Sequence, residues 1–417
     1  MFVPLVQAAA KSCGRKAAAL GALLGAGLPV PDAFVVPFAV HRAAVGDLAR
    51  RVTNRGGPEA VRGAIESRRL PPPVVGALES ALERLGHPPV AVRSSASNED
   101  SSEASAAGQY ESVLAVRGVV GVAAAVRTCW ASLHSSRATR YRTRADDDPS
   151  GPEDLAMAVI VQRHLDADVS GVMFTPASQD EPTVIEASWG LGPSVVAGTV
   201  TPDAYRVHRD GTVTCVVADE PTRLDRLGTR LLARDVPTGS RRRPTLDDAT
   251  ATGLATLGSK VAATLGAPQD IEWAIADDCL WLLQARPVTA VPPVAPPSGT
   301  SSGPATLTGT PGSGGTATGP ARTVQGPQDF TRVRLGDILI CPFTDPAWTP
   351  LLRIAAGVVT ETGGVLSHAA IVAREHGIPA VLAVPGATAA IPAGSIVTID
   401  GTAGTVVTPA DEPPPAR

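Results

Sequence analysis

The chain has few aromatic side chains and no surplus of basic charge, and both shortages exclude classes of partner. Aromatic residues make up 3% of its 417 positions, and the formal net charge is −4. Proteins that bind nucleic acids present basic surfaces, and those that bind single strands add aromatic rings on which bases stack. We therefore expect no nucleic-acid partner.

Cysteine is also scarce, and the thiols are scattered along the chain. Their spacings contain no Cys-x-x-Cys pair, which argues against a zinc site or a redox pair. An odd number of separated cysteines is typical of reduced, mostly buried thiols in the cytoplasm. The five cysteines are Cys13, Cys129, Cys215, Cys279 and Cys341.

Long hydrophobic runs are absent as well. No uninterrupted apolar stretch reaches the roughly 18 residues that a membrane-spanning helix needs. The N-terminal stretch, MFVPLVQAAAKSCGRK, is too short and too weakly apolar for a signal peptide. The sequence therefore predicts a cytoplasmic protein without a membrane partner.

What the chain does have is core-forming material and one clear break. Hydrophobic residues make up 44% of it and charged residues 18%, whereas residues 290–305 are rich in proline, serine and glycine, which is a linker composition. A flexible linker of that length spans roughly 20–25 Å, and a stiff polyproline form up to about 50 Å. We predict a first domain over 1–289, a second domain over 306–412 and a tail over 413–417.

The two parts have different patterns of hydrophobic residues. The first part mixes helical stretches with short β-rich runs and predicts an α+β domain. One of its helices, which includes Lys16, is expected to stop at Gly27 and Pro29. The second part alternates strands with one short helix, which Ser367 would cap and Gly377 would end, and predicts a small β/α domain.

Two segments of the first part hold groups suited to phosphate. In residues 91–113, a strand ending in Arg93 leads into a loop of small hydroxyl residues. The backbone N–H groups of such a loop, together with the guanidinium, could hold a phosphate, and the alternative is a serine-rich surface loop. A glycine-rich turn over 187–198 follows Glu186, and by itself it is weak support.

Two further strands, joined by an Asp-Asp turn, place an acid, an amide and a guanidinium opposite one another. Glu272 lies on the first of these strands, and Gln284 and Arg286 lie on the second. Oxygen ligands beside a guanidinium suit a magnesium–phosphate site. The alternative is a simple cross-strand Glu–Arg pair worth about 1 kcal/mol or less.

His368 follows a Gly-Gly turn and a serine at the expected start of the short helix. An imidazole is a nucleophile, and a phosphate attached to it at a helix N-terminus would meet free N–H groups and the helix dipole. The turn, Gly363-Gly364, would let a substrate approach closely because neither residue has a side chain. The alternative is a histidine with satisfied hydrogen bonds and no chemistry.

Taken together, these segments resemble the group formed by phosphoenolpyruvate synthase, pyruvate phosphate dikinase and rifampicin phosphotransferase. The first part is similar to the nucleotide-binding domain of that group through KAAALGALLGAGLPVPDAFVV, VAVRSSASNEDSSEASAAGQYESVLAVRG, VIEASWGLGPSVVAGTVTPD and DIEWAIADDCLWLLQARPVT. The second part is similar to its phosphohistidine swivelling domain through ILICPFTDPAWTPLL and TETGGVLSHAAIVAREHGIPAVLA. The resemblance covers nearly the whole chain and implies an α+β ATP-grasp domain followed by a small β/α swivelling domain.

The resemblance implies an ATP site in the first part. Lys16 and Arg93 match residues that contact the ATP phosphates, and Arg137 matches an arginine near the nucleotide. By the same resemblance, Gln162 would lie beside the adenine pocket and Glu186 near the ribose or adenine.

The resemblance also implies a metal site and a covalent carrier. Glu272 and Gln284 match the positions that bind Mg²⁺ (or Mn²⁺), and Arg286 matches the arginine that steadies the transferring phosphoryl group. His368 matches the histidine that becomes phosphorylated. One departure is Arg15, which stands where the group has the second glycine of Gly-Gly-Lys, so either the loop bends differently or Arg15 adds a phosphate contact.

The function that the resemblance implies is that of a dikinase-type phosphotransferase. The β-phosphoryl group of ATP would pass through phospho-His368 to a small hydroxylated acceptor, with release of AMP and phosphate. The acceptor is unidentified, because nothing in the sequence matches the third, acceptor-binding domain of the better-known members, and a role in secondary metabolism or antibiotic modification fits the composition. The alternatives are a phosphocarrier that serves a partner protein bearing the acceptor site, and a nucleotide sensor without catalysis.

Overall fold

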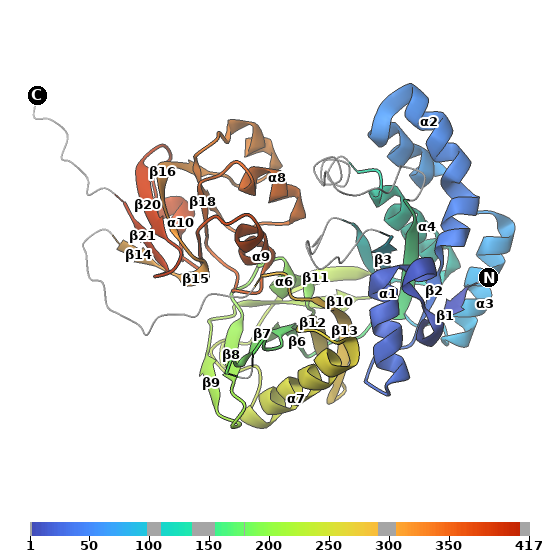
Figure 1. The fold of residues 1–417 in the computed structure, drawn as a ribbon, viewed down its shortest axis with the longest axis horizontal. Coiled ribbons are helices and arrows are strands. Elements are labelled where there is room, and N and C mark those ends of the chain that lie inside the picture. The colour runs from blue at the N-terminus through green and yellow to red at the C-terminus, as the bar shows by residue number, and fades with distance from the viewer. Residues whose placement is uncertain (1, 98–109, 136–154, 179, 291–305, 409–417) are drawn as a thin grey trace, which may run out of the picture.

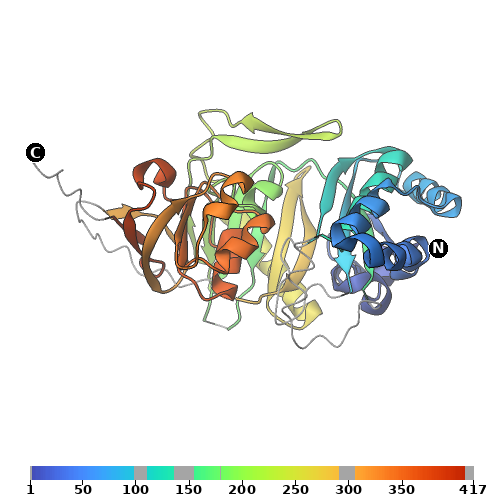
Figure 2. The same ribbon diagram turned by 90° about the horizontal axis from the view of Figure 1, so that it is seen from above.

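The computed structural model describes residues 2–97, 110–135, 155–178, 180–290 and 306–408. Arg137 and nearly all of the predicted linker therefore lie outside the described residues. The described chain is a mixed α/β structure with three β-sheets and a two-stranded hairpin. Figure 2 shows the three sheets one after another along the long axis of the molecule.

The first sheet is antiparallel and has the strand order β1-β2-β5-β3-β4. Successive residues of a strand point to opposite faces, so Val36 reaches the core under α2–α4 and Val35 reaches the core around α1. The elements of this region are β1 (Val3–Pro4), the 3-10 helix η1 (Leu5–Gln7), α1 (Ala10–Gly25), β2 (Ala33–Val36), α2 (Phe38–Ser67), α3 (Pro72–Arg84), β3 (Val90–Ala96), β4 (Ser112–Val116), α4 (Gly118–Ser132) and β5 (Met157–Arg163).

Helix α1 includes Lys16, as the sequence predicts, and it is kinked. Gly14 has φ 81° and ψ 161°, so the chain turns sharply before Arg15 and Lys16 continue the helix. The helix ends at Gly25, and Gly27, with φ 75°, takes the chain out of the helical path close to the predicted stop. The kink places Lys16 in the first turn of the longer helical segment.

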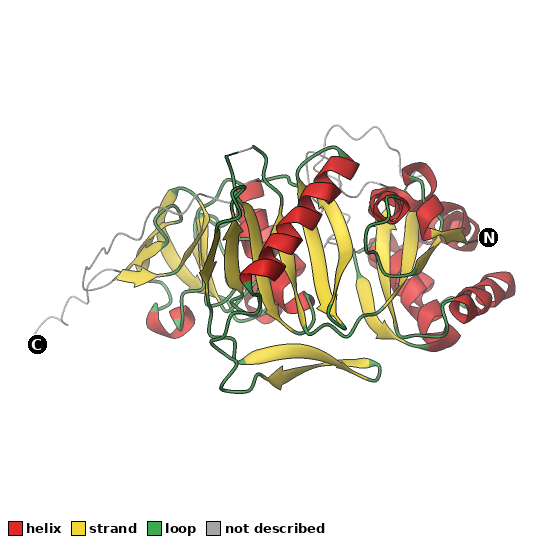
Figure 3. Cartoon of the chain, turned by 90° about the horizontal axis from the view of Figure 1, so that it is seen from below, coloured by secondary structure: helices red, strands yellow, loops and turns green. Residues whose placement is uncertain are grey.

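The second sheet is also antiparallel and has the order β13-β12-β6-β7-β8-β9. Helix α7 crosses it and shares the core that surrounds α1 (Figure 3). Asp277 and Asp278 form the predicted two-residue turn, with the positive φ values typical of a tight hairpin. The elements are β6 (Val169–Phe174), β7 (Thr183–Trp189), α6 (Pro193–Val196), β8 (Asp203–Val207), β9 (Val213–Val216), the hairpin β10 (Thr222–Leu227) and β11 (Arg230–Asp235), α7 (Asp248–Leu265), β12 (Gln269–Ala276) and β13 (Cys279–Pro287).

The third sheet, formed by the second part of the chain, has the order β14-β21-β20-β16-β17-β18-β19-β15. Its centre is parallel from β16 to β19, and its flanks are antiparallel. The elements are β14 (Thr306–Thr308), β15 (Thr310–Ser313), β16 (Thr316–Thr323), η2 (Pro327–Arg332), β17 (Ile338–Cys341), η3 (Pro346–Trp348), α8 (Thr349–Leu352), β18 (Gly357–Thr360), α9 (His368–Glu375), β19 (Ala380–Leu382), α10 (Ala387–Ala390), β20 (Ile396–Asp400) and β21 (Thr405–Val407).

Helix α9 is the predicted short helix, and one detail of its start differs from the prediction. Ser367 occupies the N-cap position, yet its side chain makes no capping hydrogen bond and its buried hydroxyl has no partner among the described residues. Only the backbone carbonyl of Ser367 takes part, accepting from the N–H of Ile371 at 3.0 Å. Gly377, with φ 64°, follows the helix end as predicted.

The second part packs against the second sheet rather than standing apart from it. Figure 1 shows α9 beside α6, and an apolar cluster joins the two sides. The cluster consists of Val172, Phe174, Val184, Val195 and Val200 from the first part and Val365, Leu366 and Ile371 from the second. This packing brings the start of α9 to the edge of the first part.

Two expectations from composition concern the whole chain. The five cysteines form no disulfide bond, and three of them, Cys13, Cys129 and Cys341, are buried. Among the residues that the structure describes, no helix combines the length and apolar character needed to cross a bilayer.

Candidate functional site

A cavity of about 470 Å³ lies between the first two sheets and the start of α9. The first sheet contributes side chains from β3 and β5, the second contributes β12 and β13, and the second part contributes the start of α9. Seven of the predicted site residues line it: Lys16, Arg93, Gln162, Glu272, Gln284, Arg286 and His368. Residues more than 300 positions apart in the chain thus share one cavity.

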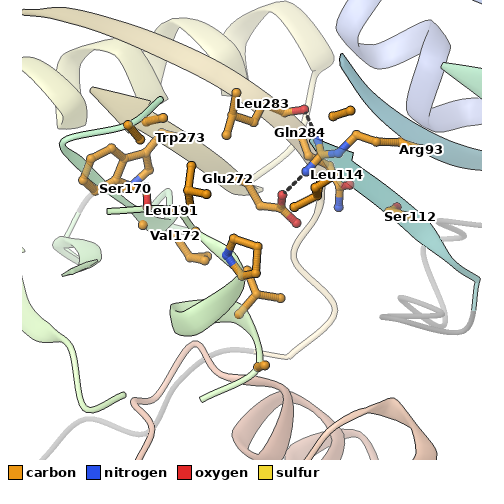
Figure 4. Close-up of a pocket in the computed structure, with 18 of the residues that line it drawn as sticks. Arg93, Ser112, Leu114, Ser170, Val172, Leu191, Glu272, Trp273, Leu283 and Gln284 are labelled. Carbon is orange, nitrogen blue, oxygen red and sulfur yellow. Dashed lines mark hydrogen bonds and ion pairs between the residues drawn. The ribbon is translucent and has the colours of Figure 1, made fainter. Parts of the chain in front are cut away.

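Two arginine–carboxylate pairs organise the polar end of the cavity. Arg93 donates to Oε2 of Glu272 at 2.6 Å and to the carbonyl of Leu283 at 2.5 Å (Figure 4). Arg286 holds Oδ2 of Asp270 through Nε at 2.8 Å and Nη2 at 2.7 Å. The simple Glu272–Arg286 pair is therefore wrong as a cross-strand pairing, because β12 and β13 set Glu272 opposite Gln284 and Asp270 opposite Arg286.

The charges around these carboxylates shift their pKa values in opposite directions. Burial alone would raise the pKa of Glu272, but Arg93, Arg286 and Lys16 hold it below its ordinary value. For Asp270, burial outweighs the attraction of Arg286 and raises the pKa. Glu272 therefore stays ionised at neutral pH, in the middle of three cations.

Lys16 reaches the cavity because of the kink in α1. The positive φ of this turn falls on Gly14, while Arg15 keeps helical angles, so the arginine at this position does not disturb the turn. Ser95 presses against Gly14 and accepts from the N–H of Ala17 at 3.2 Å. Lys16 itself is 7% exposed.

Much of the remaining lining of the cavity is apolar. Gln162 on β5 is 2% exposed, and its Nε2 has no hydrogen-bond partner among the described residues. Apolar side chains that line the same cavity include Leu165, Ala167, Leu191, Trp273 and Leu283. An unpaired buried amide at the edge of an apolar pocket suits a flat ligand that has one polar edge.

His368 is buried, at 4% exposure, and both ring nitrogens meet hydroxyl groups. Thr344 Oγ1 lies 3.0 Å from Nδ1, and Thr349 Oγ1 lies 3.4 Å from Nε2. Because the Thr349 hydroxyl already donates to the carbonyl of Pro346 at 3.0 Å, Nε2 is the donor in the longer contact and Thr344 donates to Nδ1. The ring is thus held in one orientation at the cavity wall.

Glu186 is the predicted site residue that the structure places elsewhere. It is not among the residues that line the cavity. Instead, its carboxylate lies under the turn before His368 and accepts from the backbone N–H groups of Val365 at 2.5 Å and Leu366 at 3.0 Å. Burial raises the pKa of Glu186 to about 7. Its predicted place near a ribose or adenine stays a prediction, and the contact that the structure shows is one between the two parts of the chain.

The structure adds three residues to the site that the sequence analysis does not name. Asp270 was detectable, because a β-strand puts residues two apart on the same face and Asp-Ile-Glu places it beside Glu272. Thr344 and Thr349 come from a segment whose distance to His368 only the fold determines.

The oxygen-rich end of the cavity fits a magnesium ion bound together with phosphates. Glu272 and Gln284 lie directly opposite each other, and Arg93 occupies one carboxylate oxygen of Glu272. In the described part of the chain, no three histidine, cysteine or acidic residues gather as a metal cluster. Mg²⁺ commonly takes only one or two protein oxygens and completes its shell with phosphates and water, so this sparse donor set agrees with such an ion.

Comparisons with known proteins match both parts of the chain. Residues 10–297 match the family of pyruvate phosphate dikinase AMP/ATP-binding domains, and residues 333–404 match the mobile domain of PEP-utilising enzymes. The boundaries that we predict at 289 and 306 are not tested by these matches and stay predictions.

Curated relatives match over most of this chain. A protein of Methanothermobacter thermautotrophicus named as a probable phosphoenolpyruvate synthase is 35% identical over 94% of the chain and 61% of its own length. The phosphoenolpyruvate synthase of Aeropyrum pernix is 35% identical over 94% of the chain and 56% of its own length. The phosphoenolpyruvate synthase of Pyrococcus furiosus is 37% identical over 84% of the chain and 45% of its own length. The chain thus spans about half to three fifths of the length of these relatives.

Among solved structures, likeness is weak. The D-alanine–D-alanine ligase of Coxiella burnetii aligns with 67% of this chain and 48% of its own, at 10% identity and a TM-score of 0.25.

Proposed function

The chain belongs to the pyruvate phosphate dikinase AMP/ATP-binding family and also carries a PEP-utilising mobile domain, and from this premise we propose that it is an ATP-dependent phosphotransferase working through phospho-His368. The first part would be an ATP-grasp domain that binds ATP with Mg²⁺ or Mn²⁺. The second part would be a swivelling domain that carries the phosphoryl group away, in a protein of the cytoplasm. The observation that carries the proposal is His368 in the wall of the cavity that Lys16, Arg93 and Arg286 also line.

The proposed reaction gives each of the three phosphorus atoms of ATP a separate fate. An imidazole nitrogen of His368 attacks the β-phosphorus, and the bond from this phosphorus to the oxygen bridging it to the α-phosphate breaks. AMP leaves with that oxygen, and water then removes the γ-phosphoryl group as inorganic phosphate. The histidine keeps the β-phosphoryl group as a phosphoramidate, which splits one difficult transfer into two easier ones.

The residues of the cavity supply positioning and positive charge, which are what phosphoryl transfer mainly needs. Lys16 and Arg93 would hold the phosphates, and Arg286 would face the group in transfer. Glu272 and Gln284 would hold the metal ion, which neutralises phosphate charge when bound. Gln162 would meet the polar edge of the adenine, and the apolar end of the cavity would cover its faces.

The experiment that tests this proposal follows the label of each phosphate. Protein incubated with Mg²⁺ and ATP labelled at the β-phosphorus should acquire acid-labile label, and γ-labelled ATP should leave none once phosphate is released. His368→Gln should abolish the label. His376→Gln is the matched control, because His376 ends the same helix α9 and does not line the cavity. Label retained in His368→Gln, or ADP as the nucleotide product, would contradict the proposal.

The names of the curated relatives support one choice of acceptor over others. The curated relatives are named for phosphoenolpyruvate, so we place pyruvate, as its enolate oxygen, ahead of the unidentified hydroxyl compound expected from the sequence. Because the chain covers only 56–61% of these two relatives, a partner polypeptide that bears the acceptor site stays the alternative. Phospho-His368 that turns over with pyruvate alone favours the first reading, and turnover only with an added polypeptide favours the second.

A further inference from the structure

Glu186 is a buried acid whose carboxylate accepts hydrogen bonds from the other part of the chain. It lies on β7, is 1% exposed, and accepts from Val365 and Leu366, the residues three and two positions before His368. A buried carboxylate is costly unless its oxygens are satisfied. Here both oxygens are satisfied by backbone donors that belong to the turn carrying His368.

The close approach of this turn explains one of its two glycines. A Cβ atom on Gly364 would lie 2.1–2.4 Å from the carboxylate atoms of Glu186, although the backbone of Gly364 is not left-handed and would itself tolerate a side chain. Gly363 is different, since its φ of 105° favours glycine for the turn itself. The absence of a side chain at Gly364 therefore admits Glu186, not a substrate.

Further contacts near Glu186 hold the same turn in place against the first part. The Thr362 hydroxyl donates to the carbonyl of Gly198 at 2.6 Å, and the N–H of Gly363 donates to the carbonyl of Val200 at 3.1 Å. The apolar cluster of Val365, Leu366 and Ile371 with β6, β7 and α6 surrounds these bonds. The hydrogen bonds select one position of the turn, whereas the apolar contact alone would permit sliding.

We propose that Glu186 is a positioning residue that docks the His368 turn at the ATP cavity. This inference rests on the proposed function, and it concerns how His368 is held beside the ATP cavity. Glu186 does not touch the reacting atoms; it fixes the turn, and the turn fixes the imidazole. For His368 to carry its phosphoryl group away, these two hydrogen bonds must break, after which water can solvate the carboxylate and both N–H groups.

The first test is a double-mutant cycle. Gly364→Ala introduces the clash, and a displacement of about 1 Å at a reacting group costs on the order of 100-fold in rate. We expect that loss in the rate of His368 labelling by ATP, with the dissociation constant for ATP unchanged. Glu186→Ala should cost about tenfold by leaving two donors unpaired. The double variant should be faster than Gly364→Ala alone, because removal of the carboxylate removes the clash.

The controls separate docking from damage to the fold. Gly314→Ala makes the same substitution in the second part, where the added Cβ meets its nearest neighbour at an ordinary 3.4 Å, and it should label at the wild-type rate. Glu186→Gln should recover part of the rate, since its amide oxygen still accepts one of the two N–H groups. Additive losses in the double variant, with no rescue, would overturn the proposal.

A second measurement does not depend on turnover. Hydrogen exchange of the segment 362–368 should be slow in the wild-type chain and faster in both Glu186→Ala and Gly364→Ala, but unchanged in Gly314→Ala. Equal exchange in the wild type and Glu186→Ala would reject the docking role even if labelling occurs. Slow exchange that depends on Glu186, in a chain that ATP does not label, would keep the docking role and reject the proposed function.

Discussion

At the scale of single residues, the cavity depends on arginines that are already held by acids. Arg93 is fixed by Glu272 and Arg286 by Asp270, so both guanidinium groups are oriented by the protein itself. A phosphate that enters the cavity would meet donors whose direction is set, and little side-chain entropy would be lost on binding.

One prediction concerns the Asp270–Arg286 pair. Asp270→Asn removes the charge that compensates Arg286, whose side chain is only 11% exposed. Breaking a buried pair by removing one partner costs about 3–5 kcal/mol. Urea unfolding should show a loss of this order. Asp278→Asn, in the exposed turn of the same hairpin, should change stability by about 0.5 kcal/mol or less, and equal losses in the two variants would contradict the assignment.

Another residue-scale prediction concerns Thr344. Thr344→Val keeps the shape of the side chain but removes the hydroxyl that meets Nδ1 of His368. We expect the labelling rate to fall about tenfold, the value of one hydrogen bond at the upper end of the usual range, and its pH profile to shift. Thr344→Ser should restore both. A serine variant as slow as valine would show that the methyl group, not the hydroxyl, matters.

At the scale of elements, short backbone features decide where the charged groups lie. The kink in α1 turns Lys16 into the cavity, and the alternation of β12 sets Asp270 and Glu272 on one face of the hairpin. Both features are compatible with a continuous core in the first part, because Val35 and the buried face of α1 pack against the second sheet.

The kink itself can be tested with two glycines that share a positive φ. At Gly14 an added Cβ would lie 2.3 Å from Ser95 Oγ, whereas at Gly27 it would meet nothing within 4 Å. Gly27→Ala should cost only the backbone strain of about 1–2 kcal/mol. Gly14→Ala should cost more in urea unfolding and should also weaken ATP binding through Lys16. Equal losses of stability, with ATP affinity unchanged, would contradict this account of the kink.

At the scale of the whole molecule, docking of the second part couples the site to pH. Burial raises the pKa of Glu186 to about 7 from an ordinary 4.5, against the opposing effects of the Val365 and Leu366 N–H groups, Arg374 and Arg206. Arg374, whose pKa burial lowers to about 10, stays charged over this range. The docked carboxyl keeps its proton to a higher pH than an exposed one. Docking therefore takes up a proton between about pH 4.5 and pH 7.

The resulting prediction has a definite sign. The contribution of Glu186 to docking should be full below about pH 4.5, decline as the pH rises to about 7, and stay level above that. Small-angle scattering at a series of pH values should show the fraction of expanded molecules rising over this window. Glu186→Gln should be flat there, and a slope equal to that of the wild type would assign the pH effect to another group.

Much of the local structure followed from the sequence. The α+β and β/α characters of the two parts, the Asp-Asp hairpin and the short helix at His368 were predicted because period and turn residues act over a few positions. The pairing partners of Arg93 and Arg286 were not predicted, since they depend on how separate strands are registered. The absent Ser367 side-chain cap has the same origin: the docked turn, not local propensity, decides what surrounds that hydroxyl.

The sequence by itself determined the kinds of chemistry available: cations for phosphate, oxygen ligands for a metal ion and one histidine after a glycine turn. Only the tertiary structure decided that His368 shares a cavity with Arg286 and that Glu186 binds the turn instead of lining the cavity. The physical reason is that local pattern fixes elements, whereas contacts between residues some 180 positions apart depend on how whole sheets pack against one another.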